Sequence, residues 1–534
     1  MKGLIFISML LSALTVSAQQ PDRSNRYLAD FDYLMENLIA THPDPFTAFG
    51  GTIGFYQEKQ KTREEIKSIH SNDQFVLVLN KFLSKLEDGH TFINLPKTSK
   101  NDTFKHLPVR LKVASDQLFI QNTNEAFKST IGKPIVAIND IPIDSVLASV
   151  KLYYPTENIS GSYFYLIYLL RNKNSCNKFF GDSSNYVTFT LKDQAENYRV
   201  KFPYEEKTEW LEPKSTVRLP HENGWINWAI IGPENKIAYF QWNSIVSREY
   251  LQQLNRDNPQ NMEGSLKWIY SGALKKQRTG DVIKDIAQVP ALYEQFYLLL
   301  KEMQDKGSEY LIIDLRNNSG GMTPLTKSLL YTLYGDKYIN FDFDATYSIK
   351  LSPLFLKKFG ITMEQYNKGN NTDLVTGDFN TYPFGNLQGD SYANKVSQVA
   401  NGYRGFGGEF IKKALELKMH PQIIVLTSIN TFSAAYHFAY FLKKLGKATI
   451  VGVAPRQAGN SFMQGTQIVL PNTHITGSIS NSIQILFKKD KQTGKLLHPD
   501  FEMDWNEFKK FNFDKESEVL KSIELIENKK INTR

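Results

Sequence analysis

The segment from Gln422 to Ala435 constrains the fold of this chain more than any other. It reads QIIVLTSINTFSAA, an apolar β-branched run followed by a short polar turn and by small residues that open a helix at Ser433. This pattern predicts a buried strand joined by a turn to a helix. Free backbone N–H groups and the positive end of the helix dipole stabilise a developing oxyanion at such a place. A nucleophilic serine fits there, although serine also begins helices as a plain cap.

A second segment has the same character. Residues Glu309–Gly321 read EYLIIDLRNNSGG, a buried strand that ends in a polar, glycine-rich turn, and a helix-like run follows over 323–334. Asp314 and Arg316 are expected to buttress this turn by pairing with each other. The strands of such a repeated strand–helix pattern lie in a mixed or parallel sheet covered by helices, with functional side chains at the carboxyl ends of the strands. The fold class is therefore α/β in this half, and α+β overall.

The rest of the chain divides by the period of its apolar residues. Helical periodicity covers 27–41, 53–70 and 72–86, and a period of two from about 107 to 207 predicts strands. The strand–helix half starts near residue 225. Two long polar inserts interrupt it, near 243–288 and 337–408, and inserts of that length are expected to be substrate-binding loops, lids or disordered segments.

The first eighteen residues have the form of a secretory signal. They carry one charge at Lys2, an apolar run from Leu4 to Val16, and a small-residue cleavage site ending at Ala18. No later window is apolar enough to span a bilayer, so no integral membrane segment is expected in the mature chain. The predicted location is the periplasm or the exterior.

Composition excludes several classes of function. The formal net charge is +8 over 534 residues, and the basic residues are spread in short pairs rather than clustered with aromatic residues, so no nucleic-acid partner is expected. Cys176 is the only cysteine, which rules out an intrachain disulfide and a cysteine metal site. The chain lacks a phosphate-binding loop, an HExxH motif and a GxSxG motif. No metal or organic cofactor is expected.

Two further motifs complete an ordered set. LEDGHT at 86–91 places His90 on a glycine-containing turn after an amphipathic helix, and HPDFEMD occupies 498–504. Together with the two strand–turn–helix segments, these motifs resemble the C-terminal processing peptidase and tricorn-core family of serine peptidases. The resemblance is to the branch with a DGHT histidine, and it spans most of residues 27–505.

The resemblance implies an architecture for the whole chain. A crotonase-like catalytic core would follow an N-terminal helical domain and a PDZ-like β-rich domain. The implied boundaries are a signal peptide at 1–18, the helical domain at 19–100, the PDZ-like domain at 101–224 and the catalytic domain at 225–534.

The resemblance also implies a catalytic mechanism without a cofactor. Ser433 would attack a peptide carbonyl and form an acyl-enzyme, and His90 would be its general base. The oxyanion hole would come from backbone N–H groups of Gly320, Gly321 and Ala434.

Several positions depart from the family pattern or leave choices open. Ala458 stands where another branch keeps a catalytic lysine, and Tyr436 stands where members often carry glutamate. An acid that orients the histidine cannot be placed in the stretch before Pro499. Thr91 and Tyr436 are candidate helper groups, and His437, one helical turn after Ser433, is a competing base. Arg456 could bind a substrate carboxylate, the alternative being an exposed loop arginine.

The leading function is a secreted or periplasmic serine endopeptidase that acts on polypeptides. An alternative is a catalytically inactive relative that binds a peptide or lipid-like ligand in the same cleft, and a third option is acyl chemistry of the crotonase type. The sequence leaves the oligomeric state, the natural substrate and the cleavage preference open.

Overall fold

The computed structural model describes residues 23–94, 105–194, 196–212, 215–220, 225–488 and 494–531. The predicted secretory signal at 1–18 lies outside the described residues. Within the described part of the chain, no helix is both long and apolar enough to cross a membrane.

A six-stranded sheet forms the centre of the molecule, and its strands lie in the order β19-β16-β15-β10-β9-β8. All neighbours are parallel except the β8–β9 hairpin. The predicted parallel arrangement is thus confirmed for the strands that carry the two strand–turn–helix segments. The strand bounds are β8 (Ile226–Ile231), β9 (Ile237–Trp242), β10 (Tyr310–Asp314), β15 (Gln422–Thr427), β16 (Thr449–Gly452) and β19 (Phe501–Glu502).

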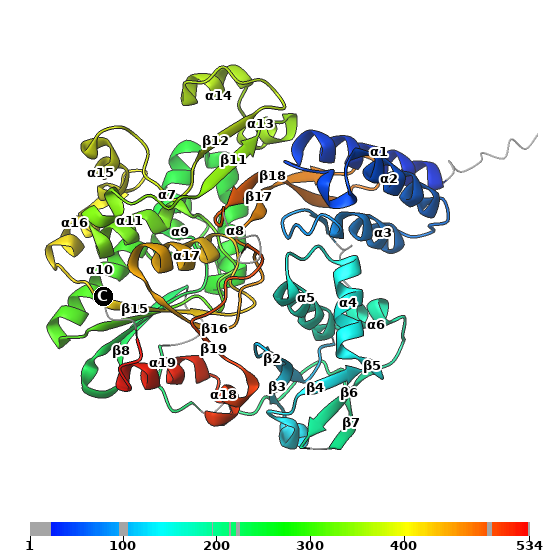
Figure 1. Ribbon diagram of the computed structural model, residues 1–534, viewed down its shortest axis with the longest axis horizontal. Helices are drawn as coiled ribbons and strands as arrows, with labels where there is room; N and C mark the ends of the chain where they lie inside the picture. The colour runs from blue at the N-terminus through cyan, green and yellow to red at the C-terminus, as the bar shows by residue number, and fades with distance from the viewer. Residues whose placement is uncertain are drawn as a thin grey trace, which may run out of the picture.

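Both faces of this sheet are covered, because its strands are apolar on both sides. In β10, Leu311 and Ile313 belong to one core and Ile312 to the other. Helices α10 (Leu292–Lys306), α11 (Pro324–Tyr334) and α17 (Ala434–Gly446) contribute to the first core. Helix α19 (Ser517–Glu527) covers the opposite face (Figure 1).

The N-terminal helices pack on a long hairpin from the far end of the chain. The helices are α1 (Arg23–Thr41), α2 (Thr52–Ile66) and α3 (Asn72–Ser84), and the hairpin strands are β17 (Ser461–Val469) and β18 (Thr476–Ile485). Ile468 and Ile479 of the hairpin lie in the core that the three helices form. Strand β1 (Phe92–Ile93) extends the contact by pairing with β18. The hairpin therefore links the helical region to the rest of the molecule (Figure 1).

The region with a period of two contains the predicted strands. They form a two-stranded hairpin, β2–β3, and a four-stranded sheet in the order β5-β4-β6-β7. The bounds are β2 (Val109–Val113), β3 (Leu118–Thr123), β4 (Ile135–Ile138), β5 (Ile141–Pro142), α4 (Ile143–Tyr153), α5 (Ile159–Arg171), α6 (Lys173–Phe180), β6 (Tyr186–Asp193) and β7 (Glu196–Pro203).

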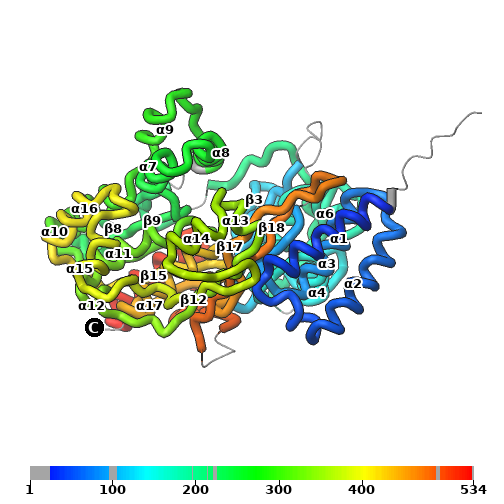
Figure 2. Tube along the Cα trace, turned by 90° about the horizontal axis from the view of Figure 1, so that it is seen from above, coloured from blue at the N-terminus to red at the C-terminus, as the bar shows by residue number. Residues whose placement is uncertain are grey.

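The two polar inserts contain regular structure where loops or disorder were expected. The first holds α7 (Arg248–Asp257), α8 (Met262–Ile269) and α9 (Val282–Gln288), which stand out from the body in Figure 2. The second holds α12 (Asp336–Ile339), β11 (Thr346–Lys350), α13 (Pro353–Phe359), α14 (Met363–Asn370), β12 (Phe379–Pro383), α15 (Tyr392–Ala400), β13 (Gly402–Tyr403), β14 (Phe406–Gly407) and α16 (Gly408–Glu416). Many of the polar residues are helix caps, and β11 joins the sheet of β18. Helix α18 (Trp505–Lys510) precedes α19.

Candidate active site

The predicted site residues gather where parallel strands end. Strands β10, β15 and β16 are neighbours, and a turn follows the carboxyl end of each. Gly320 lies in the first turn, Ser433 in the second and Arg456 in the third. This is the edge of an open parallel sheet at which ligands and reacting groups are usually held.

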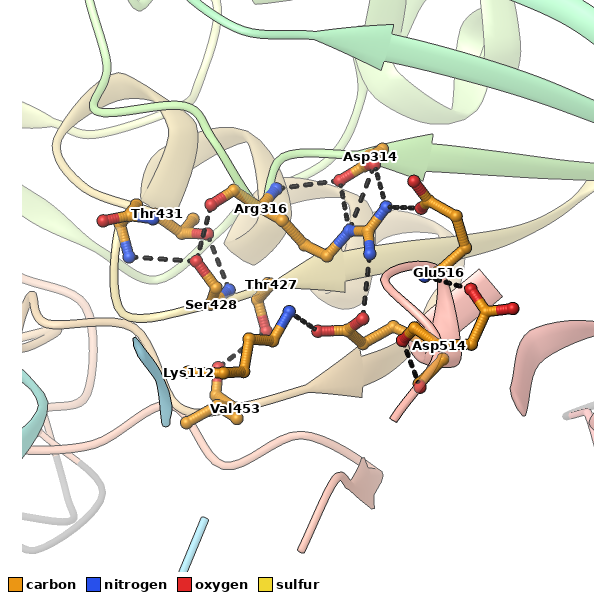
Figure 3. Close-up of polar contacts among 12 residues, drawn as sticks. Lys112, Asp314, Arg316, Thr427, Ser428, Thr431, Val453, Asp514 and Glu516 are labelled. Carbon is orange, nitrogen blue, oxygen red and sulfur yellow. Dashed lines mark hydrogen bonds and ion pairs between the residues drawn. The ribbon is translucent and has the colours of Figure 1, made fainter. Parts of the chain in front are cut away.

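Ser433 lies just before α17 and has an unusual backbone conformation that its neighbours fix. Its φ is +53°, in the left-handed region that serine rarely adopts, and its backbone N–H donates to Oε1 of Gln457. The same turn is fixed to the β10 turn by two hydroxyl groups (Figure 3). Ser428 Oγ donates to the Arg316 carbonyl at 2.5 Å, and Thr431 Oγ1 donates to the Leu315 carbonyl at 2.9 Å. The surroundings therefore hold the serine in a conformation that would otherwise cost free energy.

Gly320 lies directly against Ser433. A methyl group on Gly320 would come within 2.7 Å of Ser433 Cβ and 2.9 Å of the Ala434 nitrogen, so only glycine fits. Its N–H, however, donates to Asn318 Oδ1 at 2.8 Å. The prediction that Gly320 supplies an oxyanion donor is therefore not supported. Among the described residues, the N–H groups of Gly321 and Ala434 have no hydrogen-bond partner and stay available.

His90 lies on the turn after α3, which brings its ring to the segment that carries Ser433. Its ring stacks on Phe432, the residue before Ser433, with the ring centroids 4.6 Å apart and the planes at 21°. Asp88 Oδ1 accepts the His90 backbone N–H at 2.8 Å, and Asp88 Oδ2 bonds to His42 Nε2 at 3.2 Å. The structure thus brings the His90 imidazole against the residue that precedes Ser433, although the two segments lie more than 300 residues apart in the sequence.

Thr91, a candidate helper group, connects the DGHT turn to strand β18. Its Oγ1 accepts the backbone N–H of Ser480 in β18 at 2.9 Å. The hydroxyl group therefore pins the DGHT turn to the hairpin.

Burial keeps His90 in its neutral form. Burial lowers the pKa of His90 below its usual 6.5, and the positive charge of Arg456 lowers it further, while the negative charge of Asp88 opposes both. A neutral imidazole is the form that can accept a proton from a hydroxyl group.

Glu157 is the acid beside the histidine that the sequence motifs do not reveal. It lies in the loop between α4 and α5, where Oε2 accepts the Ala458 N–H at 2.7 Å and Oε1 accepts the Gly89 N–H at 3.3 Å. Its Oε1 is 3.9 Å from Nδ1 of His90, and Nδ1 has no hydrogen-bond partner among the described residues. Burial raises the pKa of the Glu157 carboxyl group to about 8.

A sequence signal for Glu157 does exist. It is the only charged residue between Lys151 and Arg171, in a run that is otherwise apolar, aromatic or small and polar. Asp500 lies next to the stretch where the acid was expected, but its side chain pairs with Lys443 at 2.6 Å and accepts the Ile450 N–H at 2.8 Å. Asp500 therefore supports β16 rather than the histidine.

The geometry argues against His437 as the base. Its Nδ1 lies 2.9 Å from Thr323 Oγ1 and its Nε2 lies 2.7 Å from Gln484 Oε1, so both ring nitrogens are engaged. Burial lowers its pKa to about 3. Tyr436 is fully buried, and its hydroxyl group has no hydrogen-bond partner within the described part of the chain.

Arg456 is packed into the site and is not the exposed loop arginine of the alternative. Its guanidinium carbon lies 3.7 Å from the ring centroid of Phe164 and 4.4 Å from that of Phe432. The Phe432 ring thus contacts both Arg456 and His90. The neighbouring Gln457 accepts the Ser433 N–H, which fixes this turn to the serine.

The three side chains Asp88, His90 and Glu157 offer ligand atoms within 4.8 Å of one another, close enough to surround a small cation. Both Asp88 oxygens and Oε2 of Glu157 already accept hydrogen bonds. These oxygens are therefore not free to face an ion, as the carboxylate oxygens of a metal centre do, and the arrangement fits a metal site poorly.

The predicted buttress by Asp314 and Arg316 is confirmed, and it extends further than expected. Arg316 bonds to Asp314 at 2.6 Å, and also to Glu516 at 2.7 Å and Glu518 at 2.8 Å (Figure 3). Lys112 of β2 pairs with Glu518 at 2.5 Å. One ion-pair network therefore joins three parts of the chain: the turn after β10, the C-terminal segment that includes α19, and the β-rich region that includes β2.

Comparison with known proteins agrees with these motifs. Residues 283–503 match the model of peptidase family S41, and this range includes the Gly320, Ser433 and Arg456 turns. No curated protein sequence matches the chain.

Solved structures resemble the chain over most of its length. Mature CPAF complexed with lactacystin is 14% identical, with a TM-score of 0.55 over 94% of this chain and 99% of that chain. A serine-to-alanine mutant of CPAF is 15% identical, with a TM-score of 0.54 over 96% of this chain and 99% of that chain. The photosystem II D1 C-terminal processing protease is 12% identical, covers 91% of this chain and 94% of that chain, and scores only 0.38.

At such identities the likeness to CPAF concerns the fold, a mixed α/β architecture. The family match covers the strands and turns that carry the site. With the ordered motifs, it supports the resemblance to the C-terminal processing peptidases, places residues 283–503 in the range of family S41, and identifies the protein as a serine-type peptidase.

Proposed function

We propose that this protein is an extracytoplasmic endopeptidase in which Ser433 is the nucleophile, His90 the general base and Glu157 the acid that orients His90. The observation that carries the proposal is the stacking of the His90 ring on Phe432, next to Ser433. The match to peptidase family S41 supports the reaction type, and the contacts of the described residues support the proposed roles.

The proton transfers follow from these positions. Neutral His90 takes the proton of the Ser433 hydroxyl group while Oγ attacks the peptide carbonyl carbon, and the imidazolium then gives that proton to the leaving amine. Water then attacks the resulting ester: His90 takes a proton from the water and returns it to the Ser433 oxygen, which leaves. Nδ1 faces Glu157, so we assign the proton transfer to Nε2.

Glu157 fixes the tautomer that this mechanism needs. A small rotation of the carboxyl group would shorten the 3.9 Å separation and let Oε1 accept the Nδ1 proton. Catalytic hydrogen bonds are often long without substrate and tighten when it binds. Burial keeps the Glu157 carboxyl group protonated below its pKa of about 8 in the free enzyme, and the forming imidazolium would favour its ionised form.

Gly321 and Ala434 are the proposed oxyanion donors. Their N–H groups have no partner among the described residues, and Ala434 begins α17, whose dipole favours negative charge at that end. The turn is held rigidly by Asn318, so the donors need no rearrangement when the charge develops.

The expected substrates are unfolded polypeptides or exposed polypeptide tails, with the β-rich region as a PDZ-like module that holds them. The secretory signal supports an extracytoplasmic location. N-terminal sequencing of the mature protein tests this point, with Gln19 expected as the first residue.

Activity-based labelling tests the assignment of the serine and the histidine. We expect a fluorophosphonate probe to label the protein, and the protein to hydrolyse casein. Ser433→Ala and His90→Gln should each lower casein hydrolysis by at least about a thousand-fold, since the groups act as a unit. Ser397→Ala and His498→Gln are the matched controls, because both residues are exposed on other parts of the surface.

Full labelling and turnover in the Ser433→Ala or His90→Gln variant would contradict the assignment. The binding-only alternative predicts no casein hydrolysis by the native protein. It fails if hydrolysis is observed and is lost with Ser433.

A further inference from the structure

Arg456 carries a charge that forms no ion pair with any described residue. Its Nη1 atom is shielded from solvent and has no hydrogen-bond partner among the described residues. Burial lowers the pKa of Arg456 to about 10, and the nearby groups of Tyr165 and Glu157 oppose this shift without forming an ion pair with it. A shielded donor without a partner is costly, most of all when it is charged.

The two aromatic rings hold this charge in a fixed plane. Phe164 and Phe432 lie at 3.7 Å and 4.4 Å from the guanidinium carbon, and stacking of this kind suits arginine rather than lysine. The rings orient the guanidinium group but offer no acceptor for its N–H groups. A planar fork of donors in this state matches the two oxygens of a carboxylate.

The position of Arg456 relative to the nucleophile is also fixed. Gln457, the next residue, accepts the Ser433 backbone N–H, and the Phe432 ring contacts both Arg456 and His90. A group bound to Arg456 is therefore within a few residues of the peptide bond that Ser433 attacks.

We propose that Arg456 binds a carboxylate of the peptide substrate near the scissile bond, so that the enzyme prefers substrates with such a group. This inference rests on the proposed function. The carboxylate is either the free C-terminus of the chain being cut or the side chain of an aspartate or glutamate, and the two sources give different substrate preferences.

Matched peptides separate the two sources. Cleavage sites are first mapped in casein by mass spectrometry, and one cleaved sequence is then made with a free C-terminal acid or an amide. The same sequence is also made with Asp or Asn at each position that flanks the cut. We expect kcat/KM to favour one of the carboxylate forms by about 10- to 150-fold, as hydrogen bonds to charged groups do.

Substitution of Arg456 tests its part in this preference. Arg456→Met keeps a long apolar side chain between the rings without the charge and should bring the acid-to-neutral ratio of kcat/KM close to one. Arg456→Lys keeps the charge without the planar fork and should restore part of the ratio. Arg199→Gln is the control, because Arg199 is an exposed arginine paired with Asp140.

Binding to the Ser433→Ala variant tests the carboxylate site without turnover. Calorimetry with the same peptides should show tighter binding of the carboxylate form, and this difference should vanish in Ser433→Ala/Arg456→Met. If the native enzyme cleaves no peptide, the proposed function fails while the calorimetric comparison still tests Arg456. An equal loss of kcat/KM for acid and neutral peptides in Arg456→Met would overturn the inference, because it would mark a purely structural role.

Discussion

At the scale of one residue, Glu157, the acid proposed to orient His90, opposes stability. Its side chain is only 1% exposed, and burial raises its pKa to about 8 from an ordinary value of 4.5. Below pH 4.5 the carboxyl group is protonated in both the folded and the unfolded states. As the pH rises toward 8, the unfolded chain ionises and the folded one does not, so the free energy of unfolding falls.

We therefore predict that Glu157→Gln makes stability less dependent on pH. The native protein should lose on the order of 4 kcal/mol of unfolding free energy between pH 4.5 and 8 through this one group, and the variant should not lose it. Urea unfolding at pH 5 and at pH 8.5 measures the difference. Identical pH dependence in the two proteins would show that Glu157 ionises as freely as an exposed acid.

The His90 imidazole should set the acid limb of the activity profile. Only its neutral form is a base, so activity is present above its pKa and is lost as the pH falls through it. Burial lowers that pKa below 6.5, so we expect the midpoint of kcat/KM at a pH below 6.5.

The charge of Arg456 also lowers the pKa of His90, so Arg456→Met should shift this midpoint upward. A neutral peptide substrate should be used, so that substrate binding at Arg456 does not enter the comparison. A midpoint above 6.5 in the native enzyme would contradict the assignment of His90 as a buried base.

At the scale of elements, the close approach of two turns determines the geometry around Ser433. Gly320→Ala would place a methyl group 2.7 Å from Ser433 Cβ, at a φ of +106° that alanine does not adopt readily. We predict a loss of casein hydrolysis of at least about a hundred-fold, because small displacements of the reacting atoms are that costly. Circular dichroism and the melting temperature report whether the fold is kept.

Gly307→Ala is the matched control for this prediction. Gly307 ends α10 with a φ of +68° and has open space around it, so the substitution costs backbone strain alone, about 1 kcal/mol. Activity in Gly320→Ala equal to that in Gly307→Ala would show that the contact with Ser433 is unimportant.

The sequence predicted those elements whose signal is local. Strand β15 occupies the predicted apolar run, and α1 and α17 begin within a few residues of their predicted starts, where helix boundaries are least certain. The helices of the polar inserts were not predicted, because cap residues such as Ser352 and Thr362 resemble loop residues in composition.

Sequence motifs reveal only part of the proposed site. Ser433, His90 and the glycine turn lie in recognisable motifs. Glu157 and Gln457 reach the site only through tertiary packing, from a loop and a turn with no distinctive spacing. The hydrogen bond that occupies the Gly320 N–H depends on the rotamer of Asn318, which no sequence pattern reports.

At the scale of the whole molecule, the ends of the chain are tied to its centre by the Arg316 network. Arg316 holds Glu516 and Glu518 of the C-terminal segment to Asp314 at the end of β10 (Figure 3). Removal of one member of a buried ion-pair network leaves charges without partners. We predict that Arg316→Leu lowers the unfolding free energy by about 3–5 kcal/mol.

An exposed pair provides the comparison. Arg199→Leu breaks the ion pair with Asp140, whose members are both more than half exposed, and should cost less than about 1 kcal/mol. Denaturant midpoints followed by tryptophan fluorescence measure both effects. Equal midpoints for the two variants would show that the buried network does not hold the C-terminal segment.

The N-terminal helices pack on the β17–β18 hairpin, and the proposed pairing of His90 with Ser433 depends on this packing. The most direct test of this pairing is a crystal structure of the protein after reaction with a fluorophosphonate. We predict a phosphorus–oxygen bond to Ser433 Oγ, with the His90 ring within about 3 Å of the adduct and the phosphoryl oxygen facing the N–H groups of Gly321 and Ala434. An adduct on another residue, or a His90 ring out of hydrogen-bonding reach of the labelled serine, would contradict the proposed mechanism.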